Sequence, residues 1–225
     1  MGASLWTRIK GRLKGRQFYT EKKLQSDVEE MLAFLREELQ KSGKVEKRII
    51  DVTLDELKAK SGLAISKLSM PLDVCNLPLL PVLDGMMINI SRQMELVQSR
   101  DGKRGKSRLE PDELRYLVHK PVGCYWVIDV GISESESADD TILKGISEIN
   151  QERKFCLTAE ELISLCLVTE SSDKTEIFAA GATYGSDALI PKMAQEYDGR
   201  PVLTYESLSK KSGRFLLPFC ARRIG

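Results

Sequence analysis

Residues 124–132 read "CYWVIDVGI", a nearly continuous apolar run rich in aromatic and β-branched side chains. Such a run is typical of a strand buried on both faces, so we predict a central strand of a sheet here. Asp129 interrupts the run, and an ionised carboxylate in apolar surroundings needs a partner because desolvation otherwise raises its pKa. Asp129 is therefore either a general acid or base, or a strand-end residue bonded to backbone N–H groups.

Two helices are predicted on the N-terminal side of this strand. The first, 26–43, has capping-box spacing at Ser26 and Glu29 and ends on a glycine where a left-handed C-cap belongs. The second, 53–62, repeats the box with Thr53 and a glutamate three residues on, and again ends on a glycine. Both have the apolar stripe of a helix that packs on a domain with its outer face in solvent.

Residues 77–91, "LPLLPVLDGMMINIS", carry the strongest hairpin signal in the chain. Asp84 and Gly85 stand between two apolar runs, a pattern that predicts a tight turn between two antiparallel strands. Pro78 and Pro81 cannot donate backbone hydrogen bonds, so they place the first arm at a sheet edge.

The remaining elements follow the central strand, apart from a short helix that Pro111 opens and Pro121 ends. Helices are predicted at 143–149 and, behind a capping box of Thr158 and Glu161, at 159–169; strands are predicted at 176–184, 200–207 and 214–224. Helices come first and strands later, without regular alternation, so we predict an α+β fold. It consists of N-terminal helices followed by a mixed, antiparallel-rich sheet with one or two packing helices. The expected divisions are a basic amphipathic segment (1–24), a helical region (25–70) and an α+β domain (71–225).

Composition excludes several classes of protein. The 225 residues are 42% hydrophobic and 30% charged, which fits neither bulk disorder nor a membrane-spanning protein, and no apolar run reaches the roughly 18–20 residues of a transmembrane helix. The five cysteines are odd in number and scattered, which favours a reducing cytoplasm over a disulfide framework. A single histidine and no paired cysteines argue against a structural metal site. The glycine pair in "GATYGSD" lacks the lysine of a phosphate-binding loop, and we expect no cofactor.

Charge is distributed unevenly along the chain. Seven basic side chains against one glutamate give residues 1–24 a net charge of +6, so the remainder of this +1 chain carries −5. Residues 5–18 also place leucine, isoleucine and tryptophan side chains on one side of a helix, with lysines on the other. The residues expected to contact an anionic surface are Trp6, Arg8, Lys10, Arg12, Lys14 and Arg16.

Three partners fit this segment: an anionic lipid surface, nucleic-acid phosphate, or the acidic remainder of the chain itself. The glycine-rich basic loop 99–108 offers a second phosphate contact. From these charges the sequence favours a cytoplasmic, non-enzymatic binding or adaptor protein that residues 1–24 recruit to an anionic surface, either a membrane, at which it would be peripheral, or nucleic acid. A protein partner is a further option.

The alternative is a small enzyme with a pocket near Asp129, Cys220 and Arg223. Cationic neighbours depress the pKa of a thiol and make it reactive, whereas burial makes it an inert core residue. Strand alternation predicts that Cys220 and Arg222 share one face and that Arg223 points to the other. The apolar neighbours of Cys220 favour an inert, buried thiol. If the protein is an enzyme, the sequence does not indicate which reaction it catalyses.

Three segments, "YWVIDVG" (125–131), "RKFCLTAEELISL" (153–165) and "PFCARRI" (218–224), carry a resemblance to a known family. In this order the chain, over residues 75–225, resembles an uncharacterised bacterial family known only as a domain of unknown function. The matching positions are Asp129, Gly131, Arg153, Leu157, Thr158, Glu160, Glu161, Cys220 and Arg223. The chain departs from the family in lacking tryptophan before the terminus and in having one more residue between Arg153 and Leu157. The resemblance implies that the C-terminal strand is integral to the domain, and it implies no activity.

Overall fold

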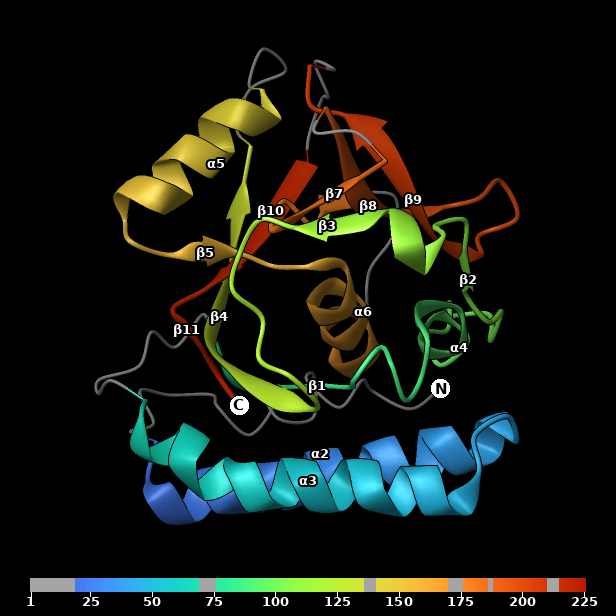
Figure 1. Cartoon of the computed structure of the whole chain (residues 1–225), viewed down its shortest axis with the longest axis vertical. Coiled ribbons are helices and arrows are strands. Elements are labelled where there is room, and N and C mark those ends of the chain that lie inside the picture. The colour runs from blue at the N-terminus through green and yellow to red at the C-terminus, as the bar shows by residue number, and fades with distance from the viewer. Residues whose placement is uncertain (1–18, 69–75, 136–140, 170–175, 186–187, 210–214) are drawn as a thin grey trace.

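Figure 1 shows the computed structural model, which describes residues 19–68, 76–135, 141–169, 176–185, 188–209 and 215–225. The helices are α2 (Glu21–Ser42), α3 (Lys47–Ser66), α4 (Ile90–Met94), α5 (Ile142–Gln151), α6 (Ala159–Val168) and the 3₁₀ turn η1 (Pro111–Glu113). The strands are β1 (Leu77–Val82), β2 (Lys106–Ser107), β3 (Leu114–Tyr116), β4 (Tyr125–Glu134), β5 (Phe155–Cys156), β6 (Glu176–Phe178), β7 (Ala182–Tyr184), β8 (Leu189–Gln195), β9 (Pro201–Ser207), β10 (Phe215–Cys220) and β11 (Arg222–Ile224).

The predicted α+β class is confirmed. Among the described residues, nine strands form one sheet in the order β1-β4-β10-β6-β8-β9-β2, with β11 beside β4 and β5 beside β10. The β10–β6 and β2–β9 pairs are parallel and the other pairs of this sheet are antiparallel, as predicted for a mixed, antiparallel-rich sheet. The 124–132 run forms most of β4, and its place between β1, β10 and β11 confirms it as a central strand.

The two N-terminal helices lie side by side along one side of the molecule (Figure 1). Helix α2 begins earlier than predicted, with Thr20 rather than Ser26 as its N-cap, and ends as predicted at Gly43, whose φ is 64°. The predicted limits of α3 were wrong, because Thr53 is buried inside the helix and Gly62 does not stop it. The apolar stripe of α3 continues past both residues, and packing of that stripe outweighs the local capping signal.

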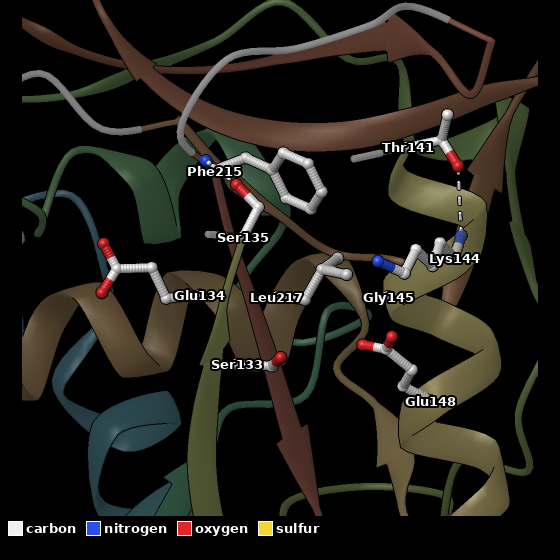
Figure 2. Close-up of a pocket in the computed structure, with 9 residues that line it drawn as sticks. All are labelled: Ser133, Glu134, Ser135, Thr141, Lys144, Gly145, Glu148, Phe215 and Leu217. Atoms are coloured by element: carbon white, nitrogen blue, oxygen red, sulfur yellow. Dashed lines mark hydrogen bonds between the residues drawn. The ribbon is translucent and has the colours of Figure 1, made fainter. Parts of the chain in front are cut away.

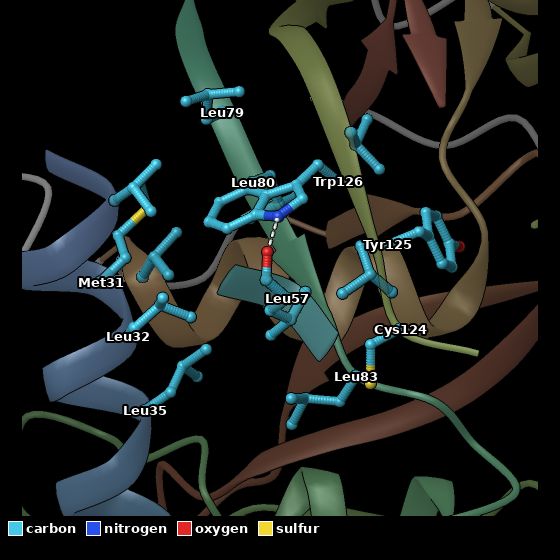
Figure 3. Packing of buried hydrophobic residues seen from close by; sticks show 14 of the residues in the cluster. Met31, Leu32, Leu35, Leu57, Leu79, Leu80, Leu83, Cys124, Tyr125 and Trp126 are labelled. Carbon is cyan, nitrogen blue, oxygen red and sulfur yellow. Dashed lines mark hydrogen bonds between the residues drawn. The ribbon is translucent and has the colours of Figure 1, made fainter. Parts of the chain in front are cut away.

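The largest cluster of buried side chains lies where α2 and α3 meet β1 and β4 (Figure 3). All six residues of β1 are buried, and the strand contacts α3 and α6 as well as β4. Trp126 of β4 is fully buried among leucines, and its indole N–H donates to the carbonyl oxygen of Leu57 in α3 at 2.8 Å. This bond satisfies the one polar group of the indole, so the ring fixes α3 on the sheet without a desolvation penalty.

The edge position of β1 is confirmed, but the hairpin predicted at Asp84 and Gly85 was wrong. Strand β1 pairs with β4 instead, and the chain turns at Asp84, whose carbonyl oxygen accepts from the backbone of Met87 and Ile88. Asn89 then caps the short helix α4 through its side chain. The second apolar run therefore forms no strand: residues 85–88 are turn and bend, and α4 begins at Ile90, which packs with Met94 in a second core cluster.

The helix predicted after Pro111 was also wrong. Only the 3₁₀ turn η1 forms, and the next residues make β3, which pairs with β7 through Leu114 and Tyr184. A proline at the first position is compatible with an α-helix and with a 3₁₀ turn. The local sequence therefore could not exclude the 3₁₀ turn.

Strand β4 changes partners at Asp129, which has the left-handed φ of 56°. Before this point β4 pairs with β11, and from Gly131 onward it pairs with β10. The side chain of Asn76 donates to Asp129 Oδ1 at 2.7 Å, which helps to hold the unusual backbone conformation. A Cβ atom on Gly131 would lie 2.4 Å from Phe219 Cζ and 2.6 Å from Asn76 Oδ1, so glycine is required at this close approach.

We predict that Gly131→Ala lowers the free energy of unfolding by about 1–3 kcal/mol, because the new methyl group overpacks this corner. Gly62→Ala is the matched control, since nothing lies within 4 Å of a Cβ at this helical position, and it should raise stability by about 0.5–1 kcal/mol. Urea unfolding of both variants measures the difference. Equal effects of the two substitutions would contradict the close packing at Gly131.

Candidate functional site

An ion pair between Glu161 and Arg223 lies at the centre of the described fold. The side chains are 0% and 5% exposed, and Arg223 Nε donates to Glu161 Oε1 at 2.6 Å and Nη2 to Oε2 at 2.8 Å. This is the bidentate geometry that makes arginine–carboxylate pairs strong. Arg223 Nη2 also donates to the carbonyl oxygen of Cys156, at 2.9 Å.

The local sequence places Glu161, the acidic member of this pair. Glu161 is the third residue of α6, and the predicted capping box is confirmed: Thr158 Oγ1 accepts from Glu161 N, and Thr158 N donates to Glu161 Oε2 at 2.8 Å. The hydroxyl of Tyr125, from β4, donates to Glu161 Oε1 at 2.8 Å. The carboxylate thus joins α6, β4 and β11, with every one of its bonds made to a buried or half-buried donor.

The charges of this network shift the pKa values of its members. Burial lowers the pKa of Arg223, but its hydrogen bonds and its attraction to Glu161 outweigh burial, so the net shift is upward. Burial, reinforced by the negative charge of Glu161, raises the pKa of Tyr125 far above its ordinary value. Both groups therefore keep their protons, and the arrangement is a fixed set of donors around one carboxylate.

A second buried carboxylate, Glu160, follows the same pattern next to the first. Its Oε1 atom accepts from the hydroxyl of Tyr116 and from Lys120 Nζ, the latter at 2.8 Å. Its Oε2 atom is buried and has no hydrogen-bond partner in the described part of the chain. Lys120 also lies 4.2 Å from the centre of the Tyr116 ring, so one cation serves both the carboxylate and the aromatic face. Glu160 thus joins α6 to β3 and the segment after it, and Glu161 joins α6 to β4 and β11.

Cys220 is fully buried, and burial raises the pKa of its thiol to about 12 although Arg223 acts in the opposite direction. The predicted sharing of a face by Cys220 and Arg222 was wrong. Arg222 is exposed and Arg223 is the buried neighbour, because β10 and β11 are separated at Ala221, opposite the left-handed turn at Asp129. A buried thiol that stays protonated is a poor nucleophile.

From the sequence, two roles were predicted for Asp129: a general acid or base, or a strand-end residue bonded to backbone N–H groups. The structure gives its carboxylate the side-chain amide of Asn76 instead. Asp129, Cys220 and Arg223 do lie near one another at the β4 corner, since the charges of both other residues act on the thiol. Each of the three is nevertheless occupied by a structural contact or by burial.

The other predicted contact residues divide between two places. Trp6, Arg8, Lys10, Arg12, Lys14 and Arg16 lie outside the described residues. In the basic loop 99–108, by contrast, cations pair with a neighbouring acidic turn: Lys106 and Arg108 contact Glu196, and Lys103 contacts Asp198. These pairs offset much of the positive charge that suggested a second phosphate contact.

A cavity of about 350 Å³ lies between β4, α5 and β10 (Figure 2). It is lined by Ser133, Glu134, Ser135, Thr141, Lys144, Gly145, Glu148, Phe215 and Leu217. This site was not predicted from the sequence, because its residues come from three separate elements and none belongs to a recognisable motif. The helix prediction at 143–149 was the only usable signal, since it placed a lysine and a glutamate one turn apart.

Within the described residues, no group of three or more His, Cys, Asp or Glu side chains is placed to hold a metal ion. None of the described helices combines the length and apolar character required to cross a bilayer.

Comparison of the chain with protein-family models, curated proteins and solved structures finds no match. The resemblance to a bacterial domain of unknown function therefore remains a prediction.

Substituting one partner of the central ion pair should be strongly destabilising. We expect Arg223→Met to lower the free energy of unfolding by about 3–5 kcal/mol, because it leaves Glu161 charged and buried. Arg222→Met, at the exposed neighbouring position, should stay within about 0.5 kcal/mol of the parent protein. Adding Glu161→Gln to Arg223→Met should recover part of the loss, and urea unfolding of the full cycle measures the coupling. Equal costs of the two arginine substitutions would contradict a stabilising role for the pair.

The buried thiol of Cys220 predicts a pH dependence. Its pKa is about 12 in the fold against an ordinary 9.0, so the folded state keeps a proton that the unfolded state loses. The stabilisation is complete below about pH 9 and decreases as pH rises toward about 12. The difference in unfolding free energy between the parent protein and Cys220→Ala should therefore shrink above about pH 9, by up to about 1.4 kcal/mol per pH unit. A constant difference across this range would show that the thiol titrates alike in both states.

Proposed function

We propose that this protein is a non-enzymatic binding or adaptor protein that attaches to anionic membrane surfaces through residues 1–24. The observation that carries the proposal is the segregation of charge, +6 in residues 1–24 against −5 in the rest of the chain. A basic segment with an apolar face is the usual form of an interfacial membrane anchor. We further propose that the protein resides in the cytoplasm and acts at the inner membrane face.

The contacts of the folded part support binding over catalysis. The residues that favoured an enzyme are engaged: Arg223 in a bidentate ion pair, Asp129 with Asn76, and Cys220 in the core with a raised thiol pKa. An enzyme needs a nucleophile or a proton-transfer group within reach of a substrate. In this corner the Cys220 thiol is buried and the carboxylate of Asp129 accepts from Asn76, which supports binding over catalysis.

The described cations also support residues 1–24 as the anchor. In the loop 99–108, Lys103, Lys106 and Arg108 already pair with acidic side chains, whereas residues 1–24 contain only one acidic residue. Each lysine or arginine near an anionic bilayer contributes about 1 kcal/mol, so several together give measurable attachment. Leu5, Trp6, Ile9 and Leu13 add the apolar face that favours lipid over nucleic acid, since phosphate backbones need no such face.

The test compares two full-length variants with the same change in net charge. In one, Arg8, Lys10, Arg12, Lys14 and Arg16 are all replaced by glutamine; in the other, Arg100, Lys103, Arg104, Lys106 and Arg108 are replaced. Co-sedimentation with vesicles of phosphatidylserine and phosphatidylcholine is measured with and without competing RNA. We expect the first variant to lose vesicle binding and the second to retain it, and binding should weaken with added salt.

Three outcomes would overturn the proposal. Equal loss in both variants would mean that total charge, not residues 1–24, controls binding. Retention by the first variant would exclude the segment as the anchor. Complete competition by RNA would identify nucleic acid as the preferred ligand. Replacing Trp6 with serine in the full chain then separates lipid insertion from simple charge attraction, because only insertion needs the apolar ring.

A further inference from the structure

The cavity between β4, α5 and β10 has walls of two kinds (Figure 2). Phe215 and Leu217 of β10 supply apolar surface, while Ser133, Lys144 and Glu148 supply a hydroxyl, an ammonium and a carboxylate. A volume of about 350 Å³ is at the small end of the range for ligand sites in proteins, about 300–1,000 Å³. A ligand that fits this cavity would be a small molecule with both polar and apolar parts.

Opposite charges enter the cavity from one face of α5. Figure 2 shows Lys144 and Glu148 extending from the helix toward Ser133 of β4, with Leu217 between the helix and the strand, while Glu134 points away. Lys144 and Glu148 are four residues apart, so their Cβ atoms lie about 5–6 Å from each other on the helix surface. A ligand that carries a positive and a negative group on neighbouring atoms can reach both side chains at once.

Contacts around the cavity leave groups for such a ligand. The carboxylate of Glu148 and the hydroxyl of Ser133 have no hydrogen-bond or ion-pair partner within the described part of the chain. Ser135 and Thr141 are committed to local structure: Ser135 Oγ accepts from Phe215 N at 3.0 Å, and Thr141 Oγ1 caps α5 by accepting from Lys144 N at 3.3 Å. These bonds fix the rim and leave Ser133 as the hydroxyl that faces the charged pair.

Close packing at the inner end determines the shape of the cavity. Gly145 faces β10, and a Cβ atom there would lie 2.5 Å from Leu217 Cδ1 and 3.9 Å from Phe215 Cε2. Because Gly145 has no side chain, α5 can approach β10 closely. The side chains of Lys144 and Glu148 therefore lie beside the apolar surface of β10. Such an arrangement of one cation, one anion and an apolar floor matches an α-amino acid, which has both charges at one end and a side chain at the other.

We propose that this cavity binds a free α-amino acid. Lys144 holds the α-carboxylate, Glu148 holds the α-ammonium, Ser133 donates to the carboxylate, and Leu217 and Phe215 contact an apolar side chain. Phosphorylated and other polyanionic ligands are disfavoured, because Glu148 would repel them and Lys144 alone would have to balance several charges. None of the lining residues belongs to residues 1–24, so this proposal does not rest on the proposed membrane attachment.

The test measures binding of individual L-amino acids to the full-length protein by isothermal titration calorimetry, starting with leucine, methionine and glutamine. Each bound amino acid is then compared with its N-acetyl derivative, which lacks the ammonium, and with its amide, which lacks the carboxylate. We expect each modification to weaken binding about tenfold or more, since each removes one charge-assisted hydrogen bond.

Variants assign each charge to its residue. In Glu148→Gln, the parent amino acid should bind about tenfold more weakly, and N-acetylation should cause no further loss. In Lys144→Met, amidation should likewise cause no further loss. Glu152→Gln removes an exposed carboxylate at the end of α5 that does not line the cavity, and it should bind like the parent protein.

Two results would overturn the proposal: failure of every L-amino acid to bind the folded parent protein, or binding that Glu148→Gln and Lys144→Met leave at the level of Glu152→Gln. Circular dichroism and urea unfolding of each variant confirm that it is folded before binding is measured. Because the charged side chains of α5 are exposed, these substitutions should preserve the fold.

Discussion

The bidentate ion pair between Glu161 and Arg223 is the interaction on which the described fold depends. It joins the N-terminus of α6 to β11 and, through Tyr125, to the central strand β4. Burial of two charges is favourable only when each is fully bonded, and here backbone and side-chain donors surround the carboxylate. The same residue also completes the capping box of α6. One glutamate therefore starts a helix and positions the last strand.

The corner in β4 explains why that ion pair can form. At Asp129 the strand adopts a left-handed conformation, supported by Asn76, and its pairing passes from β11 to β10. Irregular positions of this kind bend a strand and redirect the side chains that follow or oppose them. As a result Arg223 rather than Arg222 faces the interior. A local backbone irregularity thus decides which of two adjacent arginines is structural.

Charge is used differently in the three parts of the molecule. In the core, cations and carboxylates are paired and hold elements together, as with Arg223 and Glu161. On the surface, Lys103, Lys106 and Arg108 fasten one loop to an acidic turn. At the α5 cavity, Lys144 and Glu148 extend from one helix toward Ser133, beside an apolar wall. The proposed ligand site thus relies on exposed charges, whereas the charges of the core pair are buried.

The amino-acid sequence was sufficient to predict the fold class, the central strand at 124–132, the edge position of β1 and the capping box at Thr158. Apolar patterning, proline chemistry and helix capping are local properties, so they can be recognised without the fold. Three features became clear only from the packed fold: the run after Asp84 is a turn leading into α4 rather than a strand, α3 extends past Gly62, and the Arg223 side chain is buried. The packed fold also assembled the α5 cavity from three elements that are distant in sequence. These features depend on which surfaces meet, and packing between distant segments overrides a short local signal when the two conflict.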